Sequence, residues 1–217
     1  MPDSQFCIVE VELMVAVIQS KTIMVEQFIA EYGDDNRYEL IDGEVFDLEP
    51  TGPHEQVAAF IDRKLNVQID GLMLPYFVMQ RGLLRLSGDF TAFRPDIMVV
   101  DGREIAQEPL WPRESILTLG SSIKFVAEVV SSNWQNDYAR KFEDYAVLGI
   151  PEYWIVDYAG LGGEIFIGRP KQPTLTVCVL SEQGRYETTI LRGDQPIVSS
   201  VFPELRITAE QVLVAGQ

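Results

Sequence analysis

The stretch Ile123-Lys124-Phe125-Val126-Ala127-Glu128-Val129-Val130 has the composition of a strand buried in a sheet, broken by one carboxylate. A helical pattern follows over residues 135–148 and ends at Gly149 and Pro151, residue types that terminate helices. Residues 153–156 are then a second, wholly apolar strand, of the kind that is covered on both faces. Two such strands joined through a helix predict a parallel pair with a right-handed crossover.

Shorter elements flank this unit on both sides. Before it, the sequence predicts a helix over residues 25–32, a hairpin over 38–48 around Asp42-Gly43, a helix that starts at 51–53, and strands over 76–86 and 92–100. After it, the sequence predicts a meander of strands over 164–168, 174–180 and 185–191. A last helix starts from Thr208, where Thr208 and Gln211 fit a capping box. We therefore expect an α/β fold: a mixed sheet flanked by helices, with an added N-terminal hairpin and a C-terminal β-meander. No repeat or long linker divides the chain, which predicts a single domain over residues 1–217 with its core at about 54–157.

The composition excludes several classes of protein. The chain has 217 residues, of which 47% are hydrophobic and 23% charged, as in ordinary globular proteins. Its longest uncharged run near the N-terminus, residues 13–20, is much shorter than the roughly 20 apolar residues of a membrane span. One histidine, His54, and two distant cysteines, Cys7 and Cys178, cannot form a zinc cluster or a disulfide framework. We therefore expect a cytoplasmic protein whose metal site, if present, is built from carboxylates and holds Mg²⁺ or Mn²⁺.

The formal charge of −16 is unevenly distributed along the chain. Residues 1–80 carry a net −11 and residues 142–217 a net −5, whereas residues 81–141 hold eight acids and eight bases. A strongly acidic protein is not expected to coat nucleic acid. The neutral middle is therefore the part of the chain where a polyanion would be tolerated.

Two carboxylates stand where charges are unfavourable. Glu128 interrupts the first apolar stretch, and Asp96 lies within the predicted strand over 92–100. An ionised carboxylate that is buried without a partner is very unfavourable, so each needs compensation. If their strands are neighbours, Asp96 and Glu128 meet on one face, where they either share a proton or bind a cation. The alternative is that each pairs with a buried base such as Arg94 or Lys124; we favour the metal site, because perturbed carboxylates concentrate at functional sites.

A lysine on the predicted helix is placed to join them. Lys141 borders the apolar face of the helix over 135–148, which crosses back over the strand of Glu128. Its simplest alternative role is a surface pair with Asp137 at i,i+4. Lys124 competes for the same position, because it is on the same side of the strand as Glu128, roughly 13 Å away at about 3.3 Å per residue. We expect Lys141, rather than Lys124, to complete the group.

These residues resemble the PD-(D/E)XK nuclease superfamily, in the order Pro95-Asp96, then Glu128, then a lysine. The surrounding sequence is similar to one branch of it, the Uma-two family of restriction endonucleases. The resemblance covers about residues 22–157, with a weaker similarity at 202–205, whereas residues 1–20 match nothing in the family and form an unmatched extension. The stretches that carry it are Arg37-Tyr38-Glu39-Leu40-Ile41-Asp42-Gly43-Glu44, His54, Arg94-Pro95-Asp96, Glu128-Val129-Val130-Ser131, Asp137-Tyr138-Ala139-Arg140-Lys141-Phe142, Tyr145, Gly149, Pro151 and Glu152-Tyr153-Trp154-Ile155-Val156-Asp157.

The resemblance implies a restriction-endonuclease-like fold and a metal site made by Asp96, Glu128 and the main-chain carbonyl of Val129. A standard (D/E)XK motif would place its lysine at position 130, which is Val130 here. The resemblance moves that lysine to the helix, at Lys141, where it would stabilise the charge that develops on the phosphate.

Three further residues are tied to the site less directly. His54 opens a helix, where a side chain that bonds the backbone would be the ordinary interpretation, but the family keeps a histidine at this point, which implies proton transfer. Glu39 and Glu44 lie in the first hairpin, and either can supply another carboxylate.

The most specific hypothesis is a Mg²⁺- or Mn²⁺-dependent nuclease that hydrolyses phosphodiester bonds in DNA, with DNA as partner, no membrane association, and a homodimer as an assembly to test. One alternative is a non-catalytic binding or regulatory module on the same fold, which the net charge of −16 favours. The other is a hydrolase of small phosphorylated molecules.

Overall fold

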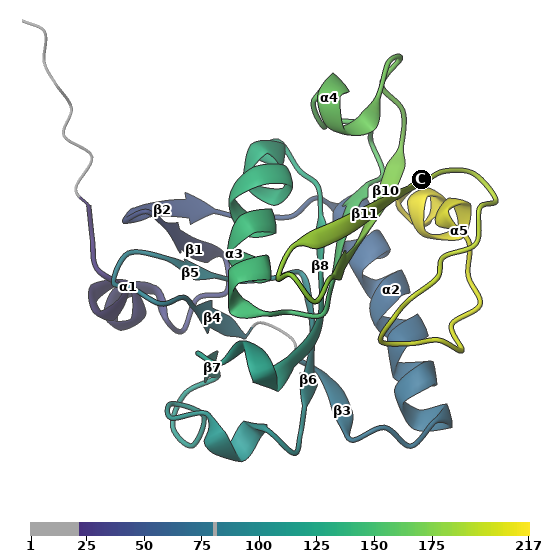
Figure 1. Cartoon of the computed structure of the whole chain (residues 1–217). Helices are drawn as coiled ribbons and strands as arrows, with labels where there is room; N and C mark the ends of the chain where they lie inside the picture. Colours follow the sequence, from purple (N-terminus) through teal and green to yellow (C-terminus); the bar gives the residue numbers. More distant parts are fainter. Residues whose placement is uncertain (1–21, 80–81) are drawn as a thin grey trace, which may run out of the picture.

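A computed structural model describes residues 22–79 and 82–217 and contains two mixed sheets in that part of the chain (Figure 1). The expected extension over residues 1–20, and Cys7 within it, lie outside the described residues. The larger sheet has the order β11-β10-β9-β8-β6-β3, in which only the pair β8–β9 is parallel. Its strands are β3 (Tyr76–Met79), β6 (Ile97–Asp101), β8 (Ile123–Val129), β9 (Glu152–Asp157), β10 (Thr174–Leu180) and β11 (Tyr186–Leu191).

The smaller sheet packs beside the larger one and has the order β2-β1-β5-β4-β7. The two sheets share a core, because Leu84 and Phe93 of the smaller sheet belong to the same buried cluster as Met98 and Val126 of the larger sheet. Its strands are β1 (Tyr38–Ile41), β2 (Glu44–Asp47), β4 (Leu83–Arg85), β5 (Ala92–Phe93) and β7 (Ile116–Leu117).

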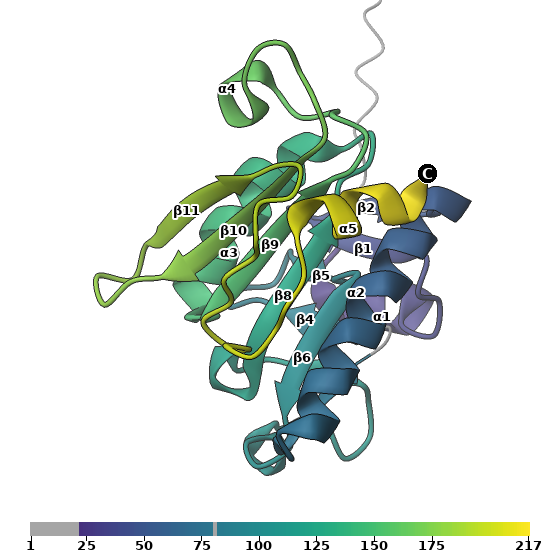
Figure 2. The ribbon, with the colours of Figure 1, turned by 90° about the vertical axis from the view of Figure 1, so that its right-hand side faces the viewer.

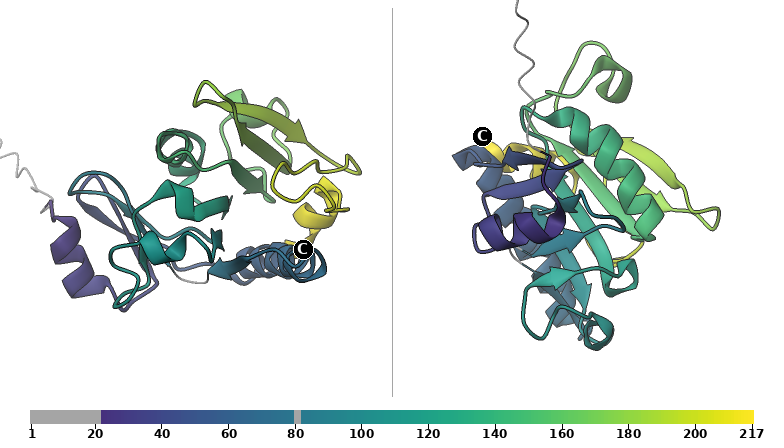
Figure 3. Two further views of the ribbon diagram at one scale, coloured as in Figure 1. Left: turned by 60° about the horizontal axis from the view of Figure 1, so that its bottom comes forward. Right: turned by 90° about the vertical axis from the view of Figure 1, so that its left-hand side faces the viewer.

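Helices cover both faces of the larger sheet. Apolar residues at every fourth position of α2, from Val57 to Ile69, pack on one face together with α5 (Figure 2). The opposite face is covered by α3, which lies across the strands in the right-hand view of Figure 3. The α-helices are α1 (Val25–Tyr32), α2 (Gly52–Gly71), α3 (Lys141–Leu148), α4 (Glu164–Ile167) and α5 (Ala209–Leu213); Ile105–Gln107, Gly120–Ser122 and Val214–Gly216 are short 3₁₀ turns. No helix in the described residues is long and apolar enough to cross a membrane.

The predicted central unit is confirmed. β8 and β9 pair in parallel, with Glu128 opposite Ile155, and the helix between them crosses one face. The N-terminal hairpin turns at Asp42 and Gly43, which both have positive φ, as a tight hairpin turn requires. The last helix begins with the predicted capping box, in which Thr208 and Gln211 bond each other's backbone N–H groups.

Two predicted strands are each divided between the sheets, which is a correction. The segment over 92–100 forms β5 in the smaller sheet and β6 in the larger one, and the segment over 76–86 likewise forms β3 and β4 around residues 80–81, which lie outside the described residues. Pro95 has no N–H to donate to a ladder, so the chain leaves one sheet at Arg94 and enters the other at Ile97. Asp96 therefore sits at the junction of the two sheets.

The strand predicted over 164–168 is wrong, because this segment is the short helix α4. Both carboxylate oxygens of Asp157 accept main-chain N–H groups, of Leu161 and Gly162, and turn the chain away from the sheet immediately after β9. The apolar pattern of the segment is not that of a buried strand either, since Ile165 is 88% exposed. The helix predicted over 135–148 is also altered: it contains a π-helical turn, Asn136–Arg140, that continues into α3.

Candidate active site

A cavity of about 320 Å³ lies at the junction of the two sheets, and every predicted site residue lines it. Asp96 comes from the connection between β5 and β6, and Glu128 and Val129 from the end of β8. His54 is in the first turn of α2, and Lys141 is the first residue of α3. Residues almost ninety positions apart in the sequence are thus brought to one point.

The Lys141 ammonium is the centre of the group. It is 3.2 Å from Glu128 Oε1, 3.3 Å from Glu39 Oε2 and 3.6 Å from Asp137 Oδ1, and the residue is only 3% exposed. Burial disfavours its charge, but the three carboxylates outweigh burial and raise the pKa of Lys141 well above its ordinary value. This ammonium is therefore protonated at any physiological pH and acts as a fixed positive charge rather than as a base.

Glu128 is the most deeply buried of the carboxylates that line the cavity. Besides Lys141, it accepts a hydrogen bond from the Tyr145 hydroxyl at 2.5 Å, which fixes the orientation of the carboxylate. Burial is the main cause that raises the pKa of Glu128 well above its ordinary value. Lys141 opposes this shift, whereas the negative charges of Asp96, Asp137 and Glu39 add to it.

Asp96 and His54 form a second pair at the more open side of the cavity. His54 Nε2 is 3.3 Å from Asp96 Oδ2, and the same oxygen accepts the main-chain N–H of Val129 at 2.7 Å. Burial disfavours the imidazolium, but the hydrogen bond and charge of Asp96 outweigh it, so the pKa of His54 is raised. The other ring nitrogen, Nδ1, is buried and has no hydrogen-bond partner among the described residues.

The π-helical turn before α3 brings a fourth carboxylate into the cavity. Asp137 and Lys141 are four residues apart, and both face inward. Burial, together with the charges of Asp96 and Glu39, raises the pKa of Asp137 to about 7, although Lys141 opposes the shift. Single π-turns inside helices are frequently associated with functional sites, since they redirect side chains that a regular helix would point elsewhere.

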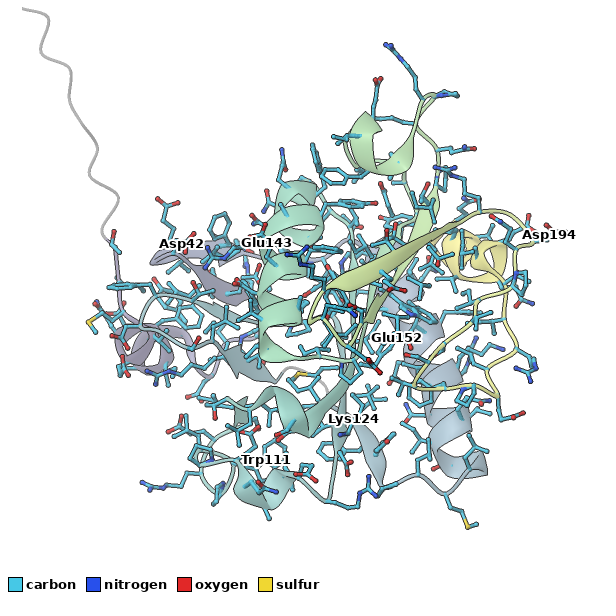
Figure 4. The ribbon with its side chains drawn as sticks, viewed as in Figure 1. Asp42, Trp111, Lys124, Glu143, Glu152 and Asp194 are labelled. Carbon is cyan, nitrogen blue, oxygen red and sulfur yellow. The ribbon has the colours of Figure 1, made fainter. Side chains whose placement is uncertain are left out.

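The structure resolves the alternatives that the sequence left open for Lys124, Glu39 and Glu44. Lys124 is at the other end of β8 (labelled in Figure 4), where its ammonium is 3.6 Å from Asp101 and not beside Glu128. Glu39 joins the cavity, whereas Glu44 is exposed on β2 and does not line it. Arg94 does line it, but its side chain donates to the main-chain carbonyls of Tyr38 and Gly33.

Asp137 and Tyr145 are the site residues that sequence reasoning missed. The sequence offered Asp137 as a surface partner for Lys141 at i,i+4 and as part of a stretch that carries the family resemblance. Tyr145 was named only among the residues that carry the family resemblance. The signal that could have found both is their spacing of four residues on either side of Lys141.

The donor set agrees chemically with a hard divalent cation. Six carboxylates line the cavity together with Lys141, Arg94 and His54, so negative charge is in excess; they are Glu39, Asp47, Glu49, Asp96, Glu128 and Asp137. Within residues 22–79 and 82–217, no three acidic, histidine or cysteine side chains already converge as a ready-made metal group. Mg²⁺ does not require one, because it usually keeps several waters and takes only one or two carboxylates from the protein.

The comparisons with known proteins agree with this geometry. The profile of the Uma2 family, described as "Putative restriction endonuclease", matches residues 25–210. The chain belongs to the Uma2 family. No curated protein gave a significant match.

This member of the Uma2 family also matches a solved structure, described as a "putative nuclease belonging to DUF820" from Anabaena variabilis. The two chains are 16% identical, and the match covers 90% of this chain and 99% of the other, with a TM-score of 0.67. At this identity the likeness shows the fold, and it confirms the expected restriction-endonuclease-like α/β class.

Proposed function

We propose that this Uma2 protein is a Mg²⁺- or Mn²⁺-dependent nuclease that hydrolyses phosphodiester bonds in DNA. The observation that carries the proposal is the excess of carboxylates in the cavity, which six acids line against one lysine, one arginine and one histidine. Carboxylates in such proximity either hold protons or bind a cation. A buried surplus of this kind is unfavourable unless function requires it.

Asp96, Glu128 and the carbonyl of Val129 would hold the ion. A bound divalent metal lowers the pKa of a water and neutralises charge that develops on a phosphate. Lys141 supplies a fixed positive charge to the phosphate oxygens, since its ammonium is held in place by three carboxylates. His54 can take or deliver a proton at Nε2, the ring nitrogen that lies beside Asp96.

Tyr145 and Glu39 are positioning residues in this proposal. The Tyr145 hydroxyl orients Glu128, and Glu39 ties Lys141 to the smaller sheet. Neither needs to touch the substrate, so their loss would act through Glu128 and Lys141.

The volume of the cavity favours a second candidate. At about 320 Å³ the cavity is within the range of small-molecule sites, roughly 300–1,000 Å³. Hydrolysis of small phosphorylated molecules by the same residues is therefore the alternative reaction.

The test is the substitution Asp96→Asn. It keeps the side-chain volume and removes one of several repelling charges, so we expect the melting temperature without metal to stay the same or rise. The response of the melting temperature to millimolar Mg²⁺ or Mn²⁺, and cleavage of labelled DNA, should be lost, because a neutral amide oxygen is a poor ligand for a hard cation.

Asp70→Asn is the matched control, since Asp70 is exposed near the end of α2. It should behave like the wild type in both measurements. A wild-type protein that neither responds to the metals nor cleaves DNA would contradict the proposal and favour a binding module. A metal response accompanied by hydrolysis of small phosphate esters alone would favour the second candidate.

The remaining parts of the proposal concern the organisation of the chain. A single domain over residues 1–217 is supported by the core that the two sheets share. A cytoplasmic location is supported by the two cysteines, Cys7 and Cys178, which are too few and too distant in sequence for a disulfide framework. A homodimer is tested directly by light scattering on the purified protein.

A further inference from the structure

An arm of the chain projects beside the cavity. The arm, defined here as residues 158–173, leaves the end of β9, forms α4 and returns to the start of β10. In Figures 1 and 2, α4 lies at the top of the molecule, beyond the ends of the strands and away from the body. Two residues of its first half, Tyr158 and Leu161, line the cavity, so the arm is part of the rim of the candidate site.

Aromatic packing holds the arm against the site. The Phe166 ring stacks on Tyr138 at 4.8 Å between centroids and meets Trp134 at 6.1 Å. Trp134 lies just before the π-helical turn that contains Asp137, and Tyr138 lies within that turn. A Cβ on Gly163 would come within 2.9 Å of Trp134, so glycine permits this close approach. The arm is therefore a packed element in a set position.

Basic residues distinguish the arm from its surroundings. It carries Arg169 and Lys171 against one acid, Glu164, for a net charge of +1 in a chain of −16. The Arg169 side chain is 83% exposed, and its contact with Glu164 is long, at 3.4 Å. Lys171 is exposed and has no carboxylate partner among the described residues. Its ammonium donates to the carbonyl of Leu161 at 3.1 Å, which places this charge at the rim of the cavity.

The other bases around the cavity are already neutralised or occupied. Arg37 pairs with Asp47 and Glu49, two residues of the opposite rim. Lys141 is enclosed by carboxylates, as described above. The arm therefore offers accessible positive charge beside a cavity whose own field is negative.

We propose that the arm is the element that holds a DNA strand next to the candidate site, with Arg169 and Lys171 as phosphate contacts. This inference rests on the proposed nuclease function, because the ligand is the substrate of that reaction. Phosphate contacts position a nucleic acid without reading its sequence and supply most of the salt-dependent affinity. A polyanion can thus be retained by a protein of high negative charge, since only the rim has to be basic.

The experiment measures binding of a fluorescently labelled DNA 20-mer by anisotropy at several salt concentrations, in single-stranded and duplex form. For Arg169→Ala/Lys171→Ala, we expect at least tenfold weaker binding at low salt. The slope of log K against log salt should fall by about 1.4–1.8, because each phosphate contact contributes roughly 0.7–0.9. Hydrolysis of bis(p-nitrophenyl) phosphate with Mn²⁺ should stay within twofold of the wild type.

The matched control is Arg185→Ala. Arg185 is exposed in the turn between β10 and β11, at the opposite end of β10, a strand of seven residues that spans roughly 20 Å. It should leave binding and the salt slope unchanged. The single variant Lys171→Arg, in which Arg169 is unchanged, keeps the positive charge at position 171 and should retain the contact with phosphate. It separates the role of this charge from that of the hydrogen bond to the Leu161 carbonyl.

The outcomes separate the two proposals. If the wild type binds and cleaves DNA but the arm variant does so equally well, or loses no more than Arg185→Ala, the arm does not hold DNA and the nuclease function stands. If the wild type neither binds nor cleaves DNA, both proposals fail. Loss of ester hydrolysis in the arm variant would show damage to the site and would also overturn the inference.

Discussion

Glu128 and Glu152 are two buried glutamates on the neighbouring parallel strands β8 and β9, and their surroundings differ completely. Glu152, labelled in Figure 4, is fully buried, and no ion pair with it is present among residues 22–79 and 82–217. Neutral donors satisfy it instead: the Trp154 indole, the Ser199 hydroxyl, the N–H and hydroxyl of Ser200, and the N–H of Val201. Glu128 has one hydroxyl and one ammonium, and five other carboxylates line its cavity.

Burial of a carboxylate is therefore not a sufficient sign of chemistry. Glu152 ties the segment over 199–201 to the start of β9, a central strand of the larger sheet, and its many hydrogen bonds leave nothing for a ligand to supply. Glu128 stands in a group with too little positive charge, which an added cation would complete. The surplus of charge, rather than the depth of burial, distinguishes the candidate site from the structural anchor.

The largest effect should come from Lys141→Met. The methionine fills a similar volume but leaves Glu39, Glu128 and Asp137 without their shared cation, so we expect a loss of about 3–5 kcal/mol in the free energy of unfolding at pH 8. The loss should be smaller at pH 5, because carboxyls with raised pKa values, such as Asp137, are then protonated. Urea denaturation at both pH values measures it. An equal loss of unfolding free energy at pH 5 and pH 8 would show that packing, and not charge, is the cause.

The same change at the two glutamates should have opposite signs. Glu152→Gln replaces an acceptor oxygen with an amide NH₂ group that faces other donors, and we expect a loss of about 3 kcal/mol in the free energy of unfolding. Glu128→Gln removes a repelling charge and keeps the contact with Tyr145, so stability at pH 8 should rise by about 1 kcal/mol while metal-dependent activity disappears. Thermal unfolding of both variants tests this. A destabilised Glu128→Gln protein would break the distinction between anchor and site.

The last prediction concerns the pH dependence of Asp137. Its pKa is about 7 in the folded protein and 3.8 as its ordinary value, so the folded state holds a proton that the unfolded state releases. Stability from this group is complete below pH 4 and is lost as the pH rises through 7. In Asp137→Asn, the fall in unfolding free energy between pH 5 and pH 8 should be about 2 kcal/mol smaller than in the wild type. Parallel curves for the two proteins would contradict the assignment.

Much of the fold follows from local sequence patterns. The central parallel unit, the hairpin at Asp42-Gly43 and the capping box at Thr208 each depend on a few adjacent residues, and all three were predicted correctly. The division of residues 92–100 between two sheets depends on a partner strand for each half, and Pro95 alone did not reveal it. α4 escaped prediction because its position depends on Asp157 and on the rings of Trp134 and Tyr138, which are distant in the sequence.

The candidate site shows the same boundary between local and distant information. Asp96 and Glu128 could be found because a charge within an apolar strand is visible in one segment. Glu39 remained one of two options, because its position depends on how the smaller sheet packs. From the residue pattern, Asp137 was considered only as an i,i+4 partner of Lys141 at the surface, because the burial of both side chains depends on how the helix packs between the two sheets.

The contact between Lys141 and Glu39 joins residues about 100 positions apart, and it links α3, which covers the larger sheet, to the smaller sheet through one buried ion pair. Contacts of such long range form late, because the loss of chain entropy precedes the gain in interaction energy. The cavity should therefore be assembled last during folding, after β8, β9 and α3 have already formed their more local contacts. A partly folded chain would then lack the complete group of acids, so that chemistry at this site would begin only in the finished protein.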